Sequence, residues 1–263
     1  MITVTPLPAF SDNYLWLLDR DGCAVVVDPG DGAVVLAGLR ARGLRLVAIL
    51  VTHHHSDHVG GLAALLAEHD VPVYGPRAEA DKITGLTRLL DDGDTVEIAE
   101  LQACFTIIAV PGHTLGHIAY FEPTQKLLFC GDTLFAAGCG RLFEGTPAQM
   151  HASLSRLSAL PPETAVFCAH EYTLGNLDFA TAVEPDNAAL AAEVERVKAL
   201  RARGLPSLPS SIAREAALNP FLRSAEPALA AAASAHGARP LNEPVDVFAA
   251  LRRWKDVYRQ RSL

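Results

Sequence analysis

The sequence lacks the features of a membrane-anchored or exported protein. It has no uninterrupted run of about 18 apolar residues, so we expect no membrane-spanning helix. The first residues, Met1 to Thr5, contain neither a basic segment nor a long apolar run, which favours a strand over a signal peptide. We therefore expect a cytoplasmic protein that has no membrane partner.

Aromatic residues and excess positive charge are also scarce. Aromatic residues make up only 6 % of the 263 residues, so leucine, valine and alanine must form most of the core. The net charge is −8 with histidine neutral, which argues against a nucleic-acid partner because such proteins usually present a basic surface. The length allows one large domain, or one domain and a smaller one.

Cysteine is sparse and has no regular spacing. The chain has an odd number of cysteines: Cys23, Cys104, Cys130, Cys139 and Cys168. Most of them lie in apolar segments. This pattern is typical of buried free thiols in a reducing compartment rather than of disulfides or metal ligands. The chemistry of the chain must therefore come from other residues.

Histidine, by contrast, is concentrated at one place. His53, His55, Asp57 and His58 are four strong metal ligands within one short segment. Neutral imidazoles and ionised carboxylates are the groups that zinc and similar divalent metals bind. Four such groups so close together cannot easily surround a single tetrahedral ion. They indicate two neighbouring metals, each of which needs further ligands from elsewhere in the chain.

Further candidate ligands follow apolar segments that we expect to be strands. The first cluster follows Leu44–Val51, and three more candidates repeat the arrangement: His113 after Ile107–Val110, Asp132 after Leu127–Cys130, and His170 after Ala165–Cys168. Strands that end at one edge of a sheet would bring these loops together, and loops on a rigid scaffold commonly carry catalytic groups. Glycines beside the candidates, Gly112 and Gly131, allow tight turns there.

The candidate ligands indicate a metal-dependent hydrolase. Asp132 is the best bridging group, since only a carboxylate has two oxygens to share, and a hydroxide could bridge as well. Water bound to such metals has its pKa lowered towards about 7, so it supplies a nucleophile at neutral pH. We expect His54 to point away from the metals and His117 to be a core or supporting residue. We assign no role to His69, His151 or His236.

The chain divides into two parts of different character. The first two-thirds alternates expected strands with turns, and a helix begins at Thr146 with Pro147 and Gln149 in the positions of a capping box. After about residue 171 we expect helices at Asp186–Arg203, Ala225–Ala238 and Val245–Arg259, and no strong strand. We therefore expect an α/β metal-binding domain at residues 1–170, followed by a helical, substrate-binding domain at 171–263.

Residues 53–58 resemble the metallo-β-lactamase superfamily, whose motif is His-x-His-x-Asp-His. The resemblance implies an αββα sandwich with a dinuclear site at one edge, followed in this chain by a smaller C-terminal α-helical domain. One fold of this kind hosts several chemistries, so the resemblance bears on the fold more than on the reaction.

A narrower resemblance, to the glyoxalase II (hydroxyacylglutathione hydrolase) family, spans the full chain. It rests on segments beginning at Ser11, Gly131, Gly138 and His170, and on two C-terminal segments: Ser11-Asp12-Asn13-Tyr14, Gly131-Asp132-Thr133-Leu134-Phe135, Gly138-Cys139-Gly140-Arg141, His170-Glu171-Tyr172, Asn219-Pro220-Phe221-Leu222-Arg223 and Arg252-Arg253-Trp254-Lys255-Asp256. The C-terminal segments discriminate best, because most relatives in the superfamily have nothing comparable there.

This resemblance implies a role for each candidate residue. His53, His55 and His113 would hold one metal, Asp57, His58 and His170 the other, and Asp132 would bridge. Asp57 and Asp132 would be the catalytic carboxylates, with Asp57 also orienting the nucleophile. The glutathione moiety would bind at Arg141, Phe143, Tyr172, Arg252 and Lys255. Phe143 replaces a tyrosine found in some members, so it cannot donate that hydroxyl hydrogen bond.

The basic C-terminal helix allows two interpretations. Taken alone, its cations are explained by their favourable interaction with the negative end of a helix. With the family resemblance, Arg252 and Lys255 become expected contacts for the carboxylates of glutathione. Arg253, Arg259 and Arg261 keep the first interpretation.

The expected activity is hydrolysis of S-D-lactoylglutathione to glutathione and D-lactate by a metal-bridging hydroxide, a step in methylglyoxal detoxification. We expect two divalent ions, zinc first, with iron or manganese as alternatives, and a monomer. The main rival is a persulfide dioxygenase of the same superfamily that uses a single iron. A nuclease, a β-lactamase or lactonase, and a metal carrier are further alternatives.

Overall fold

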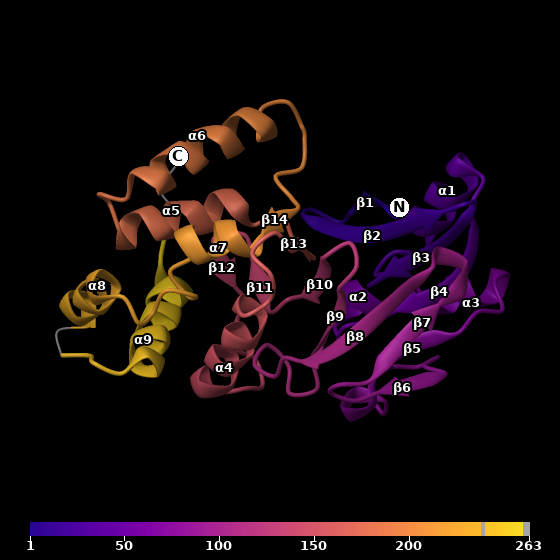
Figure 1. Ribbon diagram of the computed structural model, residues 1–263, viewed down its shortest axis with the longest axis horizontal. Coiled ribbons are helices and arrows are strands. Elements are labelled where there is room, and N and C mark those ends of the chain that lie inside the picture. The colour runs from indigo at the N-terminus through magenta and orange to yellow at the C-terminus, as the bar shows by residue number, and fades with distance from the viewer. Residues whose placement is uncertain (238–239, 260–263) are drawn as a thin grey trace.

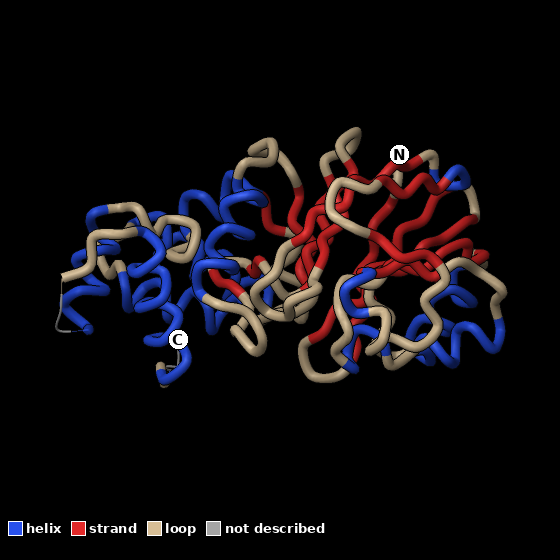
Figure 2. Tube along the Cα trace, turned by 90° about the horizontal axis from the view of Figure 1, so that it is seen from below, coloured by secondary structure: helices blue, strands red, loops and turns tan. Residues whose placement is uncertain are grey.

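The computed structural model describes residues 1–237 and 240–259 of the chain. Two six-stranded sheets lie face to face, and the helices that follow residue 171 lie to one side of them (Figures 1 and 2). The predicted order of an α/β sandwich followed by a helical part is confirmed.

The first sheet follows the chain order from one edge to the other. Its strands are β1 (Thr3–Ala9), β2 (Asn13–Arg20), β3 (Cys23–Val27), β4 (Arg45–Leu50), β5 (Val73–Pro76) and β6 (Arg88–Leu90). From β3 onward neighbouring strands are parallel, and β1 to β3 form an antiparallel meander. Sequence patterns predict strands at residues 1–5 and 44–51, which overlap β1 and β4. They do not predict β6, which has three residues and is mostly exposed.

The second sheet brings together strands from both parts of the chain. In spatial order it contains β14 (Ser210–Ser211), β13 (Ala165–Cys168), β10 (Leu127–Gly131), β9 (Ile118–Glu122), β8 (Ala103–Ala109) and β7 (Thr95–Ile98). The expectation of no strong strand after residue 171 agrees with the described residues, since β14 has only two residues and is too short to leave a pattern. β14 pairs with β13 through Ala165↔Ser211 and Val166↔Ser210.

Alternating side chains divide the core into layers. In β2, Trp16 and Leu18 point into the core between the sheets, whereas Leu15 and Leu17 point to the outer face of the first sheet. There they meet α1 (Gly32–Arg42) and α3 (Leu62–Glu68). Local patterns do not indicate α1, because its glycines and valines are weak helix formers and its own hydrophobic residues are not gathered on one face.

Helices also cover the second sheet. All residues of β10 are buried, so neither of its faces meets solvent. α4 (Pro147–Ser158) packs on this core through Met150, Leu154 and Leu157. Its start is capped as expected: the Thr146 hydroxyl accepts from the Gln149 N–H, and the Gln149 side chain accepts from the Thr146 N–H.

The C-terminal part is made of helices that follow one another closely. They are α5 (Thr173–Val183), α6 (Ala188–Arg201), α7 (Ile212–Leu218), α8 (Pro227–Gly237) and α9 (Pro244–Val257). The remaining short elements are α2 (Ser56–Val59), the 3-10 turns η1 (Arg77–Glu79) and η2 (Ala99–Leu101), and the strands β11 (Leu134–Phe135) and β12 (Gly138–Cys139). α6, α8 and α9 match predicted helices, whereas α5 and α7 are too weakly patterned to be predicted individually. Ala238 and Arg261 lie outside the described residues.

Two expectations from composition can be compared with the described residues. Among residues 1–237 and 240–259, no helix is long and apolar enough to cross a membrane. All five cysteines are free thiols, as expected, and Cys130, Cys139 and Cys168 are buried. Cys104 is exposed and Cys23 is half-buried, so the expected burial does not extend to these two.

Candidate active site

The loops that follow β4, β8, β10 and β13 meet at one place. They bring His53, His55, Asp57 and His58 together with His113, Asp132 and His170, all seven candidate ligands. Gly131, in the left-handed conformation with φ 46°, lets the β10 loop pass close to its neighbours. A Cβ at this position would lie 2.4 Å from Thr52 Oγ1, so a larger residue would push the loops apart.

The ligand atoms form groups of the size that metal ions require. Within each of three groups, all ligand atoms lie within 4.8 Å of one another: His53 with His55 and His113, His53 with His58 and Asp132, and Asp57 with His58 and His170. Asp132 lies between the first and third groups. Its Oδ2 is 3.3 Å from His113 Nε2, and its Oδ1 is 3.3 Å from His170 Nε2.

Unpartnered buried atoms show that this centre fits a metal. His58, only 1 % exposed, has no hydrogen-bond partner at Nε2 within the described chain, and neither does Asp132 Oδ1, which lies 3.4 Å away. Buried polar atoms are normally paired, since leaving them unpaired is costly. A cation between imidazoles and carboxylates satisfies them. The cluster is therefore a divalent-metal site.

The pKa values of His53 and Asp132 agree with this assignment, whereas His58 has to release a proton to bind a metal. Burial, with His58 nearby, holds the pKa of His53 well below its usual range, so its imidazole is neutral as a ligand must be. Burial alone would lower the pKa of His58, but Asp132 and Asp28 outweigh it and raise that pKa to about 9. Burial alone would raise the pKa of Asp132, yet His58 and His170 hold it well below its usual range. Asp132 is therefore ionised.

Hydrogen bonds at Nδ1, the ring nitrogen that faces away from the centre, orient three of the ligand imidazoles. His58 Nδ1 donates to Asp28 Oδ2 over 2.9 Å, and His170 Nδ1 donates to Asp12 Oδ1 over 2.8 Å. His113 Nδ1 donates to the carbonyl of Arg141 over 2.8 Å. With Nδ1 committed in each case, Nε2 is left to face the centre.

Two of the supporting groups carry no assignment from sequence. Asp28 also accepts from the Thr52 N–H and hydroxyl, both over 2.7 Å. It directly follows β3, and this position after an apolar strand, shared with the candidate ligands, was an available signal. Glu79, on η1, has no such signal. It is buried and joins two ligand loops, because it accepts from the His54 N–H on one loop and from the Thr114 hydroxyl and Gly116 N–H on the other.

The two neighbouring histidines lie as predicted from sequence. His54 Nδ1 donates to Glu79 over 2.8 Å, away from the ligand groups. His117 is fully buried, stacks on His53 with ring centroids 4.6 Å apart, and accepts from the Asp132 N–H over 3.1 Å. It therefore supports Asp132 from behind.

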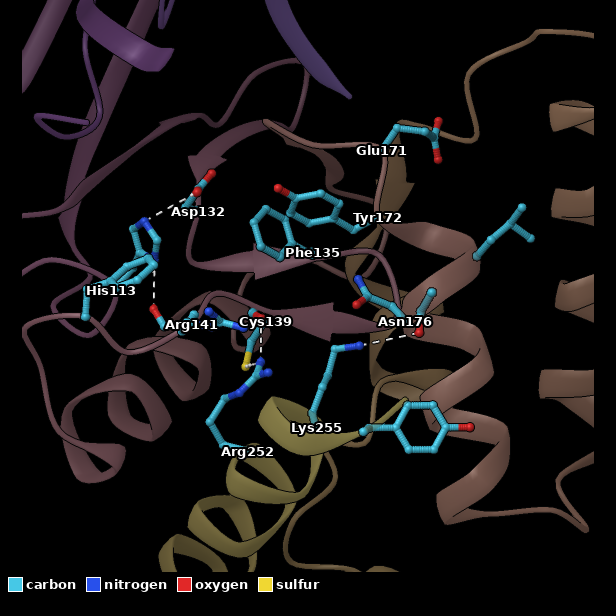
Figure 3. Close-up of a pocket in the computed structure, with 14 residues that line it drawn as sticks. His113, Asp132, Phe135, Cys139, Arg141, Glu171, Tyr172, Asn176, Arg252 and Lys255 are labelled. Carbon is cyan, nitrogen blue, oxygen red and sulfur yellow. Dashed lines mark hydrogen bonds and ion pairs between the residues drawn. The ribbon is translucent and has the colours of Figure 1, made fainter. Parts of the chain in front are cut away.

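A cavity of about 610 Å³ connects this centre to the helical part (Figure 3). His113 and Asp132 line one end, and α9 forms the opposite wall. All five residues predicted to bind substrate line it: Arg141, Phe143, Tyr172, Arg252 and Lys255. The α5 residues Leu174, Gly175 and Asn176 also line it, although sequence patterns assign them no role.

The residues predicted to bind substrate differ in their exposure and in the contacts that they already make. Phe143 is 61 % exposed at the rim, and its ring meets the rings of His55 and His113 edge to face. Tyr172 stacks flat on His170, with centroids 4.7 Å apart. Arg252 is buried and already donates to the Cys139 carbonyl over 2.9 Å and to Asp256 over 3.0 Å.

Lys255 lies in a partly dehydrated position at this wall. Its Nζ is 3.4 Å from the Gly175 carbonyl and lies over the ring of Phe179, 5.1 Å from the centroid. Burial, followed by the charge of Arg252, lowers its pKa to about 8. Arg253 and Arg259, by contrast, are exposed and do not line the cavity.

Comparison with known proteins agrees with both the sandwich and the helical part. Residues 10–170 match the metallo-beta-lactamase superfamily, and residues 171–258 match the hydroxyacylglutathione hydrolase C-terminus. The chain is 56 % identical to a hydroxyacylglutathione hydrolase of Ectopseudomonas mendocina, and 54 % identical to one of Cupriavidus taiwanensis. Each alignment covers 98 % of this chain and 100 % of the relative.

Solved structures share the fold. The crystal structure of ETHE1 from Myxococcus xanthus has a TM-score of 0.69 at 23 % identity, covering 99 % of this chain and 93 % of that one. TTHA1623 in a di-iron-bound form has a TM-score of 0.61 at 28 % identity, covering 84 % of this chain and 100 % of that one. With its centre, its cavity and these full-length relatives, the chain belongs to the hydroxyacylglutathione hydrolase family of the metallo-β-lactamase superfamily.

Proposed function

We propose that this protein hydrolyses S-D-lactoylglutathione, and related 2-hydroxyacyl-glutathiones, to glutathione and the free hydroxy acid. The observation that carries the proposal is a single cavity with a metal centre at one end and cationic side chains at the other. Its volume of about 610 Å³ suits a small peptide-like ligand. A glutathione thioester has a reactive carbonyl near one end and two carboxylates further along, which matches this polarity.

We assign the ligands of two divalent ions from the geometry and the family. His53, His55 and His113 would hold one ion, Asp57, His58 and His170 the other, and Asp132 would contact both. Bound there, the ions would act as Lewis acids and lower the pKa of water so that it can attack at neutral pH. We propose zinc first, with iron or manganese as alternatives, because mixed histidine and carboxylate sites accept all three.

The chain itself would orient the reacting groups. Burial alone would raise the pKa of Asp57, but His58 and a hydrogen bond from Asn13, 3.0 Å long, lower it. Asp57 is thus an ionised acceptor that can align the attacking water, in addition to serving as a ligand. The leaving thiolate needs no strong general acid, because a thiol has a pKa of only about 8.5.

The opposite wall would bind the glutathione moiety. Lys255 and the exposed guanidinium of Arg141 are the cations best placed to pair with its carboxylates. Arg252 would act mainly by holding the wall, since Cys139 and Asp256 already occupy donors of its guanidinium. Phe143 would contribute packing only. We accordingly divide the chain into a metal-binding domain at 1–170 and a substrate-binding domain at 171–263.

Two expectations from composition belong to this proposal. We propose that the protein acts as a monomer and in the cytoplasm, where free thiols such as Cys104 are kept reduced. Size-exclusion chromatography with light scattering tests the first statement.

The rival interpretation, a single-iron persulfide dioxygenase, accounts for less of the molecule. It leaves the group of Asp57, His58 and His170 without a purpose, and it does not explain the family match at residues 171–258. One iron per chain together with persulfide-dependent oxygen uptake would favour it.

The direct test is to load the purified protein with zinc and follow the loss of thioester absorbance of S-D-lactoylglutathione. We expect turnover that a chelator abolishes and added zinc restores. A folded protein that binds two metals but does not hydrolyse the thioester would rule out the proposed activity and leave the fold assignment intact.

A further inference from the structure

A short hairpin separates the metal centre from the helical part. It consists of β11 and β12, which pair through Leu134↔Cys139 and Phe135↔Gly138. Ala137, at its turn, adopts a left-handed conformation with φ 53°. Two residue pairs form too small a ladder to fix such a loop by themselves. Other groups must therefore hold it.

Side chains of the helical part supply those groups. Asn219, just after α7, donates from Nδ2 to the carbonyls of Phe135 and Gly138, over 3.2 and 2.9 Å. Glu215, on α7, accepts from the Ala137 N–H over 2.7 Å. Asn219 also donates to Glu215 over 3.0 Å, so the two side chains form one unit.

Side chains of two further helices also form hydrogen bonds with the hairpin backbone. Asn176 on α5 donates to the Ala136 carbonyl over 2.9 Å, and Arg252 on α9 donates to the Cys139 carbonyl over 2.9 Å. Figure 3 shows Asn176 and Arg252 beside the hairpin, with Arg252 next to Cys139. The hairpin backbone thus bonds to side chains from helices at least 40 residues away in sequence.

The hairpin in turn touches both sides of the metal centre. Just beyond it, the Arg141 carbonyl accepts from His113 Nδ1 over 2.8 Å, the bond that orients this imidazole. The adjoining Gly140 passes so close to the β10 loop that a Cβ would lie 1.9 Å from the Asp132 carbonyl oxygen. On the other side, the ring of Phe135 meets the ring of His170 edge to face at 5.8 Å.

The Glu215–Asn219 unit is costly to bury. Glu215 is 1 % exposed and Asn219 is fully buried. Burial raises the pKa of Glu215 to about 7, even though hydrogen bonds from Ser210, Asn219 and the Ala137 N–H lower it. Burial of polar side chains is costly unless they are hydrogen-bonded, and a buried network whose bonds are made holds the backbone that it contacts in one arrangement.

We propose that Asn219 and Glu215 are positioning residues: by holding the β11–β12 hairpin they orient His113 and shape the cavity wall. The helical part then has two tasks, since it organises the metal centre in addition to contacting the substrate. The catalytic side of this inference rests on the proposed thioester hydrolysis. The metal-binding side does not.

The experiment measures zinc retention against a competing chelator, together with kcat and KM for S-D-lactoylglutathione. In Asn219→Ala we expect weaker zinc retention and a kcat lowered by about 10–100-fold, the range typical of lost groups that orient metal ligands. Glu215→Ala should behave in the same way. Glu215→Gln should retain near-normal values, because its amide oxygen can still accept from the Ala137 N–H.

A matched control separates positioning from simple loss of stability. Asn187 is also in the helical part, where it caps α6 by accepting from the Ala189 and Leu190 N–H groups. Asn187→Ala should lower the melting temperature but leave zinc retention and kcat unchanged. If Asn219→Ala does not fold, Asn219→Ser, which keeps one donor, takes its place with a smaller expected loss of zinc retention.

Each result bears on the inference. Normal zinc retention and kcat in Asn219→Ala, or equal losses in Asn187→Ala at an equal melting temperature, would overturn it. If the wild-type protein does not hydrolyse the thioester, the proposed function fails, and the zinc measurements alone decide whether the hairpin contacts organise the centre.

Discussion

The two ends of the cavity are built in different ways. At the metal end, imidazoles and carboxylates follow buried strands, Asp28 orients His58 from behind, and Glu79 joins two of the ligand loops. At the helical end, long flexible cations such as Lys255 lie on helices, and the firm contacts are made to backbone carbonyls. The first end is preorganised for chemistry, whereas the second can adapt to a ligand. Substitutions of the ligands and their supports at the first end should therefore affect metal and turnover, and those of the cavity-lining cations at the second end should affect binding.

Asp132→Ala should have the largest effect. It removes the carboxylate that faces both His113 and His170, so we expect the variant to lose metal and activity together. Metal analysis by atomic emission and the thioester assay measure this. A variant that kept two metals and full turnover would contradict the bridging assignment.

Asp28→Ala should have the next largest effect, although Asp28 is not a proposed ligand. His58 loses the acceptor that holds its ring, so metal affinity or activity should fall by about 10–100-fold. Asp31→Ala is the matched control nearby, since Asp31 only caps α1 by accepting from Ala33 and Val34. It should change stability alone. Equal metal affinity in both variants would show that the metal end does not depend on this support.

Lys255→Ala tests the helical end. Losing one charge-assisted contact of about 1.4 kcal/mol should raise KM roughly tenfold with little change in kcat. Arg253→Ala is the control, because Arg253 is exposed and does not line the cavity. An unchanged KM in Lys255→Ala would return the cations of α9 to a purely helix-stabilising role.

The smallest effect we expect is on pH dependence. The pKa of Lys255 is lowered to about 8 by burial and Arg252, against the opposing charges of Asp178 and Asp256. The side chain is a cation below this pH and neutral above it, so KM should rise by a few-fold between about pH 7 and 9. Lys255→Arg stays charged throughout and should flatten the profile. A rise of equal size in that variant would assign the titration to another group or to the substrate.

The same division explains what the sequence could predict. The metal end is encoded locally. His53 to His58 lie within one short segment, and each remaining candidate follows an apolar strand. These local signals predicted that all seven side chains would meet. Asp28 obeys the same rule and could have been found by it. Glu79 could not, because its partners are set by how η1 meets two loops that are distant in sequence.

The helical end depends on long-range packing that no local period encodes. Asn219 meets Phe135 across 84 positions, and Arg252 meets Cys139 across 113. Only the family resemblance indicated that Arg252 and Lys255 lie at the cavity. Even so, the burial of Arg252 and its bonds to the hairpin followed from the structure alone. The α5 wall escaped prediction because α5 is nearly uniform in hydrophobicity and shows no clear polar face.

The two-residue strand β14 has a consequence for expressing the parts of this chain separately. It covers the outer edge of β13, which otherwise ends the second sheet on that side. A fragment ending at residue 170 would present that edge to solvent, and an open edge invites strands of other molecules to pair with it. Such a fragment should self-associate. By pairing with β13, the β14 segment of the helical part should therefore also prevent aggregation through this edge.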